Sequence, residues 1–387
     1  MTSQPVRRPR DRKQTIIRTA AELFSEKGFH GVHLGEIATA VGISTPALYR
    51  HFKGKSDLLA RVLAEDCDRI QRITGAADSA QGALRGLAEG VAERRELAVL
   101  WQREARNLPE ELRDACQGQM RGVGERVAGL LRRERPDLSA GGAELLAWAA
   151  LGVAASPGHH RVPCTPARLR ERMEQLSVSV LRHGVVHEDV PAPAPAGPAG
   201  GGLAPASRRE ALIGAATELF GSRGFHEVSL DDIGAAVGIA GPSVYKHFAA
   251  KGEILYELLN RGAAVLQLVL TRAMSTARTP QEALDALVRG YVEVVGEHTE
   301  MFSALVTEVI NLPDDQRHAI RRIQHDYVAE WVELLRQVRP DLDRTDARLT
   351  VQGALGMISD VWGTCHLRRR PRLAEELAGL SRLLFSC

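Results

Sequence analysis

The 387-residue chain has little cysteine, very little lysine and no long apolar run. Its five cysteines are scattered without any Cys-x-x-Cys pair, which argues against a disulfide framework and a structural zinc site and favours a reducing cytoplasm. The longest apolar stretch, 145–155, has 11 residues, whereas a membrane-spanning helix needs about 20. No basic segment followed by an apolar one opens the chain, so we expect no secretory signal. These absences predict a cytoplasmic protein without a membrane partner.

Familiar catalytic motifs are also missing. The chain has no His-Glu-x-x-His, no Gly-x-Ser-x-Gly and no Gly-x-x-x-x-Gly-Lys-Ser/Thr. We therefore expect no enzyme, no cofactor and no metal centre, although His183 and His187 are four residues apart. We expect the histidines at 159–160, in a proline-rich segment, to be solvated. A redox role for Cys67 or Cys116 stays open beside the commoner case of inert buried thiols.

Charge and lysine are unevenly placed. The formal net charge is only +2, so any affinity for nucleic acid depends on where the charges lie. Arginine supplies most of the 50 basic residues, and the lysines fall in two short windows. The six lysines are Lys13, Lys27, Lys53, Lys55, Lys246 and Lys251.

Those two windows belong to an internal repeat. Residues 21–59 align without gaps to 217–255, an offset of 196, and 19 of 39 positions are identical. Such self-similarity indicates duplication. Two tail motifs recur at an offset of 204: Asn-Leu-Pro at 107–109 and 311–313, and Arg-Pro-Asp-Leu at 135–138 and 339–342.

The sequence predicts helices throughout both copies. Apolar residues recur at helical spacing from 16 to 24 and from 212 to 220, and no strand pattern competes in the tails. Between the copies, alternating Pro and Ala favour an extended linker that could span up to roughly 55 Å. We predict an all-α chain with a first head at 1–60, a first tail at 61–187, a linker at 188–206, a second head at 207–256 and a second tail at 257–387.

Each head carries a helix-turn-helix pattern. A short helix, 34–41 or 230–237, leads to a tight turn at Gly42 or Gly238, and a third helix starts at residue 45 or 241. Tyr-x-His-Phe-x-x-Lys follows at the same spacing in both copies. The second helix of such a motif enters the major groove of DNA, and its first residues reach base edges.

The run from Ile37 to Leu59 closely resembles the N-terminal signature of the TetR family of bacterial regulators, and 233–255 resembles it too. The resemblance implies a DNA-binding head, a tail that binds a small molecule, and pairing through the last two helices of each copy. The tandem form is similar to fused lipid-metabolism regulators of actinobacteria. Carried over residue by residue, DNA contact falls on Thr45, Pro46, Ala47, Tyr49, Arg50, His51 and Lys55, and on Gly241, Pro242, Ser243, Tyr245, Lys246, His247 and Lys251. The alternative for Tyr49 and Tyr245 is that they pack the head.

The two heads differ in charge. Residues 1–60 carry ten basic and five acidic residues, whereas 201–256 carry five basic and six acidic. The arm at Arg7–Arg10 could enter a minor groove or remain a basic tail. The second short helix starts with Asp231 and Asp232 behind Ser229, a good N-cap but unfavourable near phosphate.

Aromatic, methionine and arginine side chains in the tails could line an effector pocket, although ordinary core packing is the alternative. The candidates are Trp101, Arg103, Met120, Trp148, Tyr291, Phe302, Tyr327, Trp331 and Trp362. We expect a ligand-responsive regulator, a repressor released by a small apolar, acyl-type effector, reading double-stranded DNA with two unlike recognition helices. We expect one chain to form a pseudo-dimer within itself, as a monomer or weak homodimer. The alternative function is a ligand-binding or protein-interaction module whose heads, one or both, no longer bind DNA.

Overall fold

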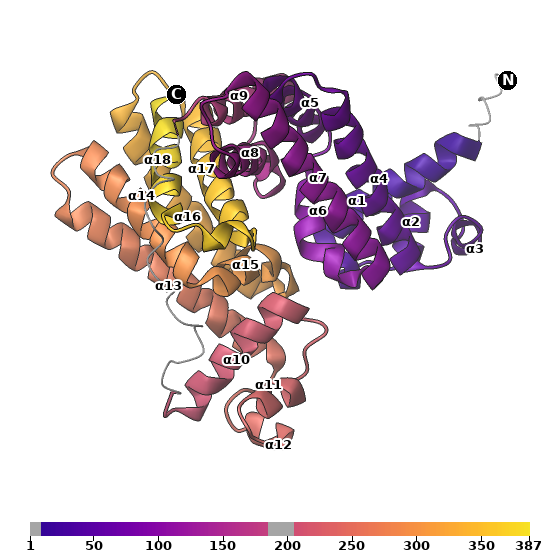
Figure 1. Ribbon diagram of the computed structural model, residues 1–387. Helices are drawn as coiled ribbons and strands as arrows, with labels where there is room; N and C mark the ends of the chain where they lie inside the picture. Colours follow the sequence, from indigo (N-terminus) through magenta and orange to yellow (C-terminus); the bar gives the residue numbers. More distant parts are fainter. Residues whose placement is uncertain (1–8, 185–204) are drawn as a thin grey trace.

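The computed structural model describes residues 9–184 and 205–387, and within these ranges every regular element is helical (Figure 1). The predicted all-α class is confirmed. Arg7 and Arg8 of the basic arm, His187 and nearly all of the predicted linker lie outside the described residues.

Within 9–184 and 205–387, each copy contains nine α-helices in the same order. The first copy contains α1 (Pro9–Gly31), α2 (Leu34–Val41), α3 (Thr45–Tyr49), α4 (Lys55–Ala76), α5 (Ala80–Glu93), α6 (Glu96–Glu104), α7 (Glu110–Glu134), α8 (Ala140–Ala155) and α9 (Pro166–Leu181). The second contains α10 (Arg208–Arg223), α11 (Leu230–Ala236), α12 (Gly241–Val244), α13 (Lys251–Thr276), α14 (Pro280–Glu297), α15 (Thr299–Thr307), α16 (Asp314–Val338), α17 (Arg344–Gly363) and α18 (Leu373–Ser386).

Four glycines fix the turns of the heads. Gly28 interrupts α1 with a φ of 74° and Gly224 ends α10 with a φ of 84°, and Gly42 and Gly238 form the helix-turn-helix turns with φ of 72° and 71°. Any other residue would be strained in this left-handed region. No other described residue lies in this left-handed region. The repeated glycines therefore give both heads the same backbone path.

Head and tail share a continuous helix in each copy. Helix α4 starts in the first head and runs past residue 60, and α13 runs past residue 256 in the same way. The first head has its own apolar core, to which α6 contributes Leu97 and Leu100. The core of the second head is continuous with that of both tails. A movement in either tail can therefore reach its head through a rigid element.

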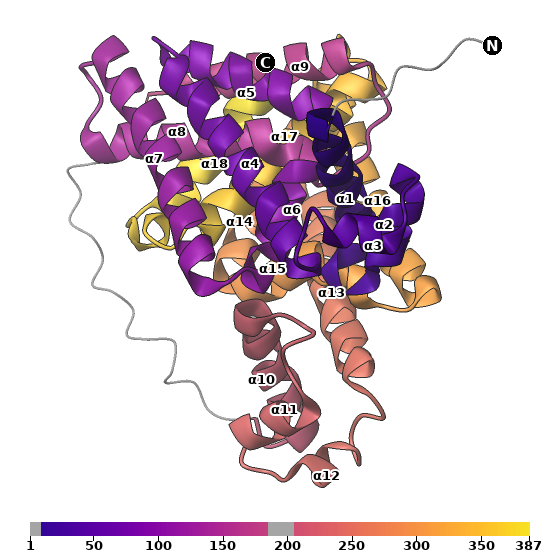
Figure 2. The same cartoon turned by 90° about the vertical axis from the view of Figure 1, so that its right-hand side faces the viewer.

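The two copies pack against each other through α8, α9, α17 and α18, which lie side by side in both views (Figures 1 and 2). Helix α8 packs along α17, and α9 contacts both α17 and α18. The backbones come close because Gly152 faces Asp360 on α17 and Gly356 faces Ser156 after α8. These two contacts are equivalent at the repeat offset of 204, as in a pseudo-dimer. The predicted pairing of 139–155 and 166–183 with 343–363 and 371–385 is confirmed within the chain.

One described helix, α13, is long and apolar enough to cross a membrane by length and composition alone. Its residues Ile254, Leu258 and Leu266 are buried, and the helix packs on α14 and α16 as a core helix does. This composition is weak evidence for a membrane span.

Candidate DNA interface and head–tail junction

The recognition helix α3 places its apolar side inside the first head and its polar side outside. Leu48 and Phe52 are buried, whereas Tyr49 is 54% exposed and Arg50 is exposed. Pro46 lies in the first turn, where its missing N–H costs no hydrogen bond. Thr45, Ala47 and His51 are half-buried. The surface of α3 therefore offers a phenol and a guanidinium to a partner.

The second head repeats this arrangement. Val244 and Phe248 are buried, Tyr245 is 61% exposed and Lys246 is exposed. Pro242 is exposed, while Gly241, Ser243 and His247 are half-buried. The exposure of Tyr49 and Tyr245 argues against a packing role for either ring.

Lys55 and Lys251 make contacts that the sequence did not suggest. The Lys55 ammonium donates to the Val32 carbonyl at 3.0 Å and lies 4.5 Å from the centroid of the Phe29 ring. Lys251 donates to the Val228 carbonyl at 2.6 Å in the same way. Burial lowers the pKa of both ammonium groups. Both lysines thus tie the start of α4 or α13 to the loop before the short helix, and their predicted contact with phosphate remains a prediction.

The recognition helices differ at their first residue. A Cβ on Gly241 would come within 1.5 Å of Asp231 Oδ1, so the Asp231 carboxylate occupies the space beside the start of α12. The first head has the reverse pair, because Gly35 replaces the aspartate and faces the Thr45 hydroxyl 3.8 Å from its own Cβ position. The second head therefore presents a carboxylate where the first presents a hydroxyl.

The short helices also start differently. Ser229 Oγ accepts the Asp232 N–H at 3.0 Å, and Asp232 Oδ2 accepts the Ser229 N–H at 2.8 Å, which forms a capping box. The hydrogen bonds from Ser229 lower the pKa of Asp232. His33, at the same position of the first head, makes no side-chain cap. The predicted N-cap at Ser229 is confirmed.

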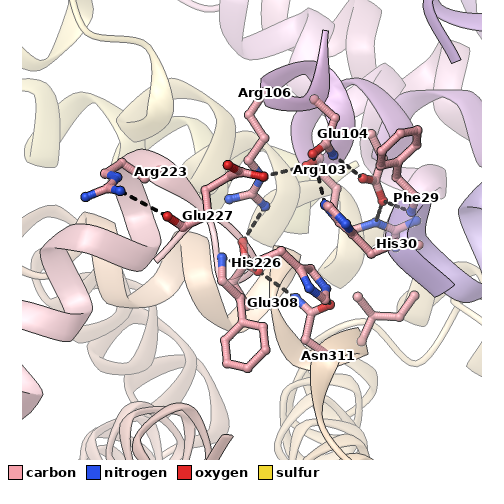
Figure 3. Close-up of a pocket in the computed structure, with 15 residues that line it drawn as sticks. Phe29, His30, Arg103, Glu104, Arg106, Arg223, His226, Glu227, Glu308 and Asn311 are labelled. Carbon is pink, nitrogen blue, oxygen red and sulfur yellow. Dashed lines mark hydrogen bonds and ion pairs between the residues drawn. The ribbon is translucent and has the colours of Figure 1, made fainter. Parts of the chain in front are cut away.

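A buried glutamate joins each head to its tail. Glu104 Oε1 accepts the Phe29 N–H at 3.2 Å, and Glu308 Oε2 accepts the Phe225 N–H at 3.4 Å (Figure 3). Asn107 and Asn311 donate to the same carboxylates at 2.8 and 2.7 Å. These residues line a polar cavity between the two copies. Sequence reasoning placed Glu104 only near the first-tail candidates for effector binding and did not assign either glutamate to this junction, although Glu-x-x-Asn-Leu-Pro recurs at 104–109 and 308–313.

The histidines that follow these phenylalanines meet between the copies. The rings of His30 and His226 stack with centroids 3.9 Å apart (Figure 3). Asn107 Oδ1 lies 3.2 Å from His30 Nε2, and Asn311 Oδ1 lies 2.9 Å from His226 Nε2. Burial, followed by the charge of His30, lowers the pKa of His226. The two head–tail junctions therefore touch each other directly.

Most second-tail candidates for effector binding form one aromatic cluster. Trp331 is fully buried, and the rings of Tyr291 and Tyr327 meet it edge-on at centroid distances of 5.8 and 6.1 Å. Phe302 is also buried, and Trp362 is half-buried against Gly296. Within the described structure, Tyr327 Oη, Trp331 Nε1 and Trp362 Nε1 are buried and make no hydrogen bond of good geometry, and burial raises the pKa of the Tyr327 phenol against the opposing effect of its contact with Trp331.

The first-tail candidates are dispersed. Trp101 packs on the core of the first head, and Trp148 packs against Gly124. Met120 is half-buried on α7. Arg103 alone among all the candidates lines the polar cavity, where it donates to the Phe24 carbonyl at 2.6 Å.

The expectation that His159 and His160 are solvated is wrong. His160 is 8% exposed, and both ring nitrogens of His159 are buried without a partner in the described structure. Burial lowers the pKa of His159 to about 4 and that of His160 to about 3, so both rings are neutral at pH 7. Gly158 explains the burial, because it packs this segment closely against Ala98 on α6.

The matches to known protein families fall on both copies of the repeat. The family model described as "Bacterial regulatory proteins, tetR family" matches 16–62 and 212–258, and a "Tetracyclin repressor-like, C-terminal domain" model matches 277–363. The transcriptional repressor KstR2 of Mycolicibacterium smegmatis is 31% identical over 153 residues, which cover 36% of this chain and 71% of KstR2. The transcriptional activator FasR of the same organism is 31% identical over 101 residues, which cover 26% of this chain and 46% of FasR.

Solved structures of TetR-family regulators cover less than half of this chain. The ketosteroid transcriptional regulator KstR2 of Mycobacterium tuberculosis is 25% identical, covers 45% of this chain and 95% of its own, and has a TM-score of 0.38. The duplicated N-terminal match and the length of KstR2 that is covered decide the family. This chain belongs to the TetR family of bacterial transcription regulators and carries the family's DNA-binding domain twice.

Proposed function

We propose that the protein is a ligand-responsive repressor whose two unlike recognition helices read an asymmetric operator. One difference between the heads supports this proposal. Thr45 in the first head corresponds to Gly241 in the second, and Gly35 corresponds to Asp231. A hydroxyl can donate a hydrogen bond to one base or accept one from another. A carboxylate only accepts, as from the N4 amino group of cytosine, and it repels phosphate. A symmetric homodimer reads a palindrome because its helices are identical, so unlike helices should read unlike half-sites.

Sequencing DNA selected by the purified full chain tests this proposal. We expect two half-sites of different sequence, with log affinity falling linearly as log salt rises. Removal of 7–10 should flatten the salt slope without changing the preferred bases, because these arginines would neutralise phosphates. A footprint centred on a perfect palindrome would contradict unlike readout.

The same experiment decides the alternative function. Residues 201–256 carry one more acidic than basic residue, and Asp231 lies beside the second recognition helix. Both features favour a second head with weak or no DNA binding. A single protected half-site would support that reading, and no salt-dependent binding at all would leave a cytoplasmic ligand-binding or protein-interaction module.

The effector site is proposed at the aromatic cluster of the second tail. A buried hydroxyl or indole N–H without a partner costs about 1–3 kcal/mol, which a polar group of a bound ligand would recover. Tyr327 and Trp331 supply such groups inside apolar surroundings, the usual composition of a ligand site. An apolar, acyl-type effector with one polar end fits this chemistry and the resemblance to fused lipid-metabolism regulators.

Effector binding would reach the DNA-binding head through the head–tail junction. Helix α15 carries Phe302, and just beyond its end Glu308 holds the Phe225 N–H at the end of the second head's first helix. A ligand that displaces α15 therefore moves the head, which is the kind of two-state coupling that regulation requires. We expect effector binding to weaken DNA binding and so release repression; a reporter gene that is activated by the protein would contradict repression.

Tyr327→Phe tests the effector site. A panel of acyl and steroid thioesters should raise the melting temperature of the full chain, and Tyr327→Phe should reduce that rise by at least half. The apo melting temperature should change little, because no hydrogen bond of good geometry holds the hydroxyl. Tyr256→Phe, on the partly buried face of α13, is the matched control. Equal ligand shifts in both variants, or no shift with any thioester, would exclude this site.

A further inference from the structure

The contact between the two head–tail junctions encloses two buried carboxylates. Glu104 is 3% exposed and Glu308 is 1% exposed. Each accepts a backbone N–H from the end of a head helix. A buried carboxylate without a cation is strongly destabilising, so each glutamate needs a positive partner.

Both arginine partners come from the first copy. Arg103 Nε donates to Glu104 at 2.7 Å within that copy. Arg106 reaches across the interface and donates to Glu308 (Figure 3). At the repeat offset of 204, the second copy has Thr307 and Ile310 in place of these arginines. Thr307 supplies only a hydroxyl hydrogen bond of 3.1 Å to Glu308.

The packing around the junction is equally one-sided. Arg106 lies over Gly224, where a Cβ would come within 2.5 Å of Nη1. Ile310, its counterpart, lies over Gly28 at an ordinary distance of 3.8 Å. One side of the contact is therefore fitted to an arginine and the other to an isoleucine.

We propose that this junction is a pairing determinant that fits the first copy to the second and rejects pairing of either copy with its like. Two second copies would bury two Glu308 carboxylates without any arginine, leaving each only the charge of Lys251, which is bonded to backbone carbonyls. Two first copies would place four arginines around two glutamates. Only the unlike pair gives one arginine to each glutamate. This inference does not depend on DNA or effector binding.

Hydrogen bonds elsewhere between the copies also run from donors in the first copy to acceptors in the second. Arg168 Nε donates to Asp346 at 2.9 Å, and Gln102 Nε2 donates to Asp360 at 2.6 Å, each from the first copy to the second. One ion pair, Glu144 with His366 at 3.0 Å, runs the other way and is half-exposed. Two first copies would lose the acceptors at Asp343, Asp346 and Asp360, because the equivalent residues are Ser139, Gly142 and Ser156.

The test uses the full chain with Arg106→Ile, which makes both sides isoleucine and leaves Glu308 without its arginine. We expect the melting temperature to fall by roughly 5–10 °C. Thr307→Arg in the same chain should recover at least half of that loss, because the new arginine stands to Glu308 as Arg103 stands to Glu104. Arg121→Ile, on the exposed face of α7, is the control and should change the melting temperature by no more than about 1 °C.

Light scattering gives the second readout. The unaltered chain should have the mass of one chain, 42.1 kDa, because its own two copies pair. Arg106→Ile should increase the two-chain fraction, since two first copies then satisfy both Glu104 carboxylates. Adding Thr307→Arg should leave the two-chain fraction raised, because each glutamate then has an arginine in its own copy and every pairing of copies is balanced. If Arg106→Ile is insoluble, Glu308→Gln in that chain should restore solubility by removing the buried charge.

The proposal is overturned if Arg106→Ile matches Arg121→Ile in melting temperature and mass. It is also overturned if neither Thr307→Arg nor Glu308→Gln recovers any of the loss. A fall in melting temperature with recovery by either second substitution supports it.

Discussion

Replacing Tyr49 and Arg50 together by alanine should lower operator affinity about 100-fold, because each contact to base or phosphate contributes about 1–3 kcal/mol. Both side chains are exposed on α3, and neither is needed to bury Leu48. The equivalent change at Tyr245 and Lys246 should cost only about 10-fold, since Asp231 already opposes phosphate beside α12. Fluorescence anisotropy with labelled operator at one fixed salt concentration measures both losses.

Thermal unfolding is the control for this comparison. Exposed side chains contribute little to folding, so both double variants should melt within about 2 °C of the unaltered chain. Leu48→Ala and Val244→Ala, which remove buried side chains, should instead destabilise their heads. Equal losses of affinity from the two double variants would show that the heads contribute equally and would refute the asymmetry proposed for them.

Relative to an Asp360→Asn variant, the chain should lose about 2–4 kcal/mol of stability as the pH rises from about 4 to 8, because the buried Asp360 carboxyl must ionise. Burial between the copies raises the pKa of this carboxyl from its ordinary 3.8 to about 7, against the opposing effect of the Gln102 hydrogen bond. The folded state then holds a proton that the unfolded state has released between these two values. Its stabilising contribution is therefore complete below pH 3.8 and is lost as the pH rises through 7.

Asp360→Asn provides the matched test. The amide keeps the oxygen that accepts from Gln102 Nε2 at 2.6 Å and cannot ionise. Urea unfolding of Asp360→Asn should show the rise in stability with pH that the buried neutral His159 and His160 give, and its stability advantage over the unaltered chain should grow from pH 5 to pH 8. The same change with pH in both proteins would assign the pH dependence to another group.

The sequence by itself determined the heads. Helical periodicity, the left-handed glycines at 28, 42, 224 and 238, and the repeated Tyr-x-His-Phe-x-x-Lys predicted the helices, the turns and the exposed face of the recognition helices. These features are local, because a turn residue or an apolar stripe acts on its immediate neighbours in the chain. The pairing of the last helices of each copy came from the family resemblance, and the structure confirmed it.

Only the tertiary structure determined which charged and titratable side chains are buried or paired. Lys55 looked free for phosphate, but its ammonium meets the Val32 carbonyl, which the fold brings close across 23 residues. His159 and His160 looked solvated in a proline-rich segment, yet α6 covers them. Arg106 meets Glu308 across 202 residues, and local sequence pattern does not encode such a distant contact. Burial, pKa and ion pairing depend on what packs against a side chain, and that is decided by the whole fold.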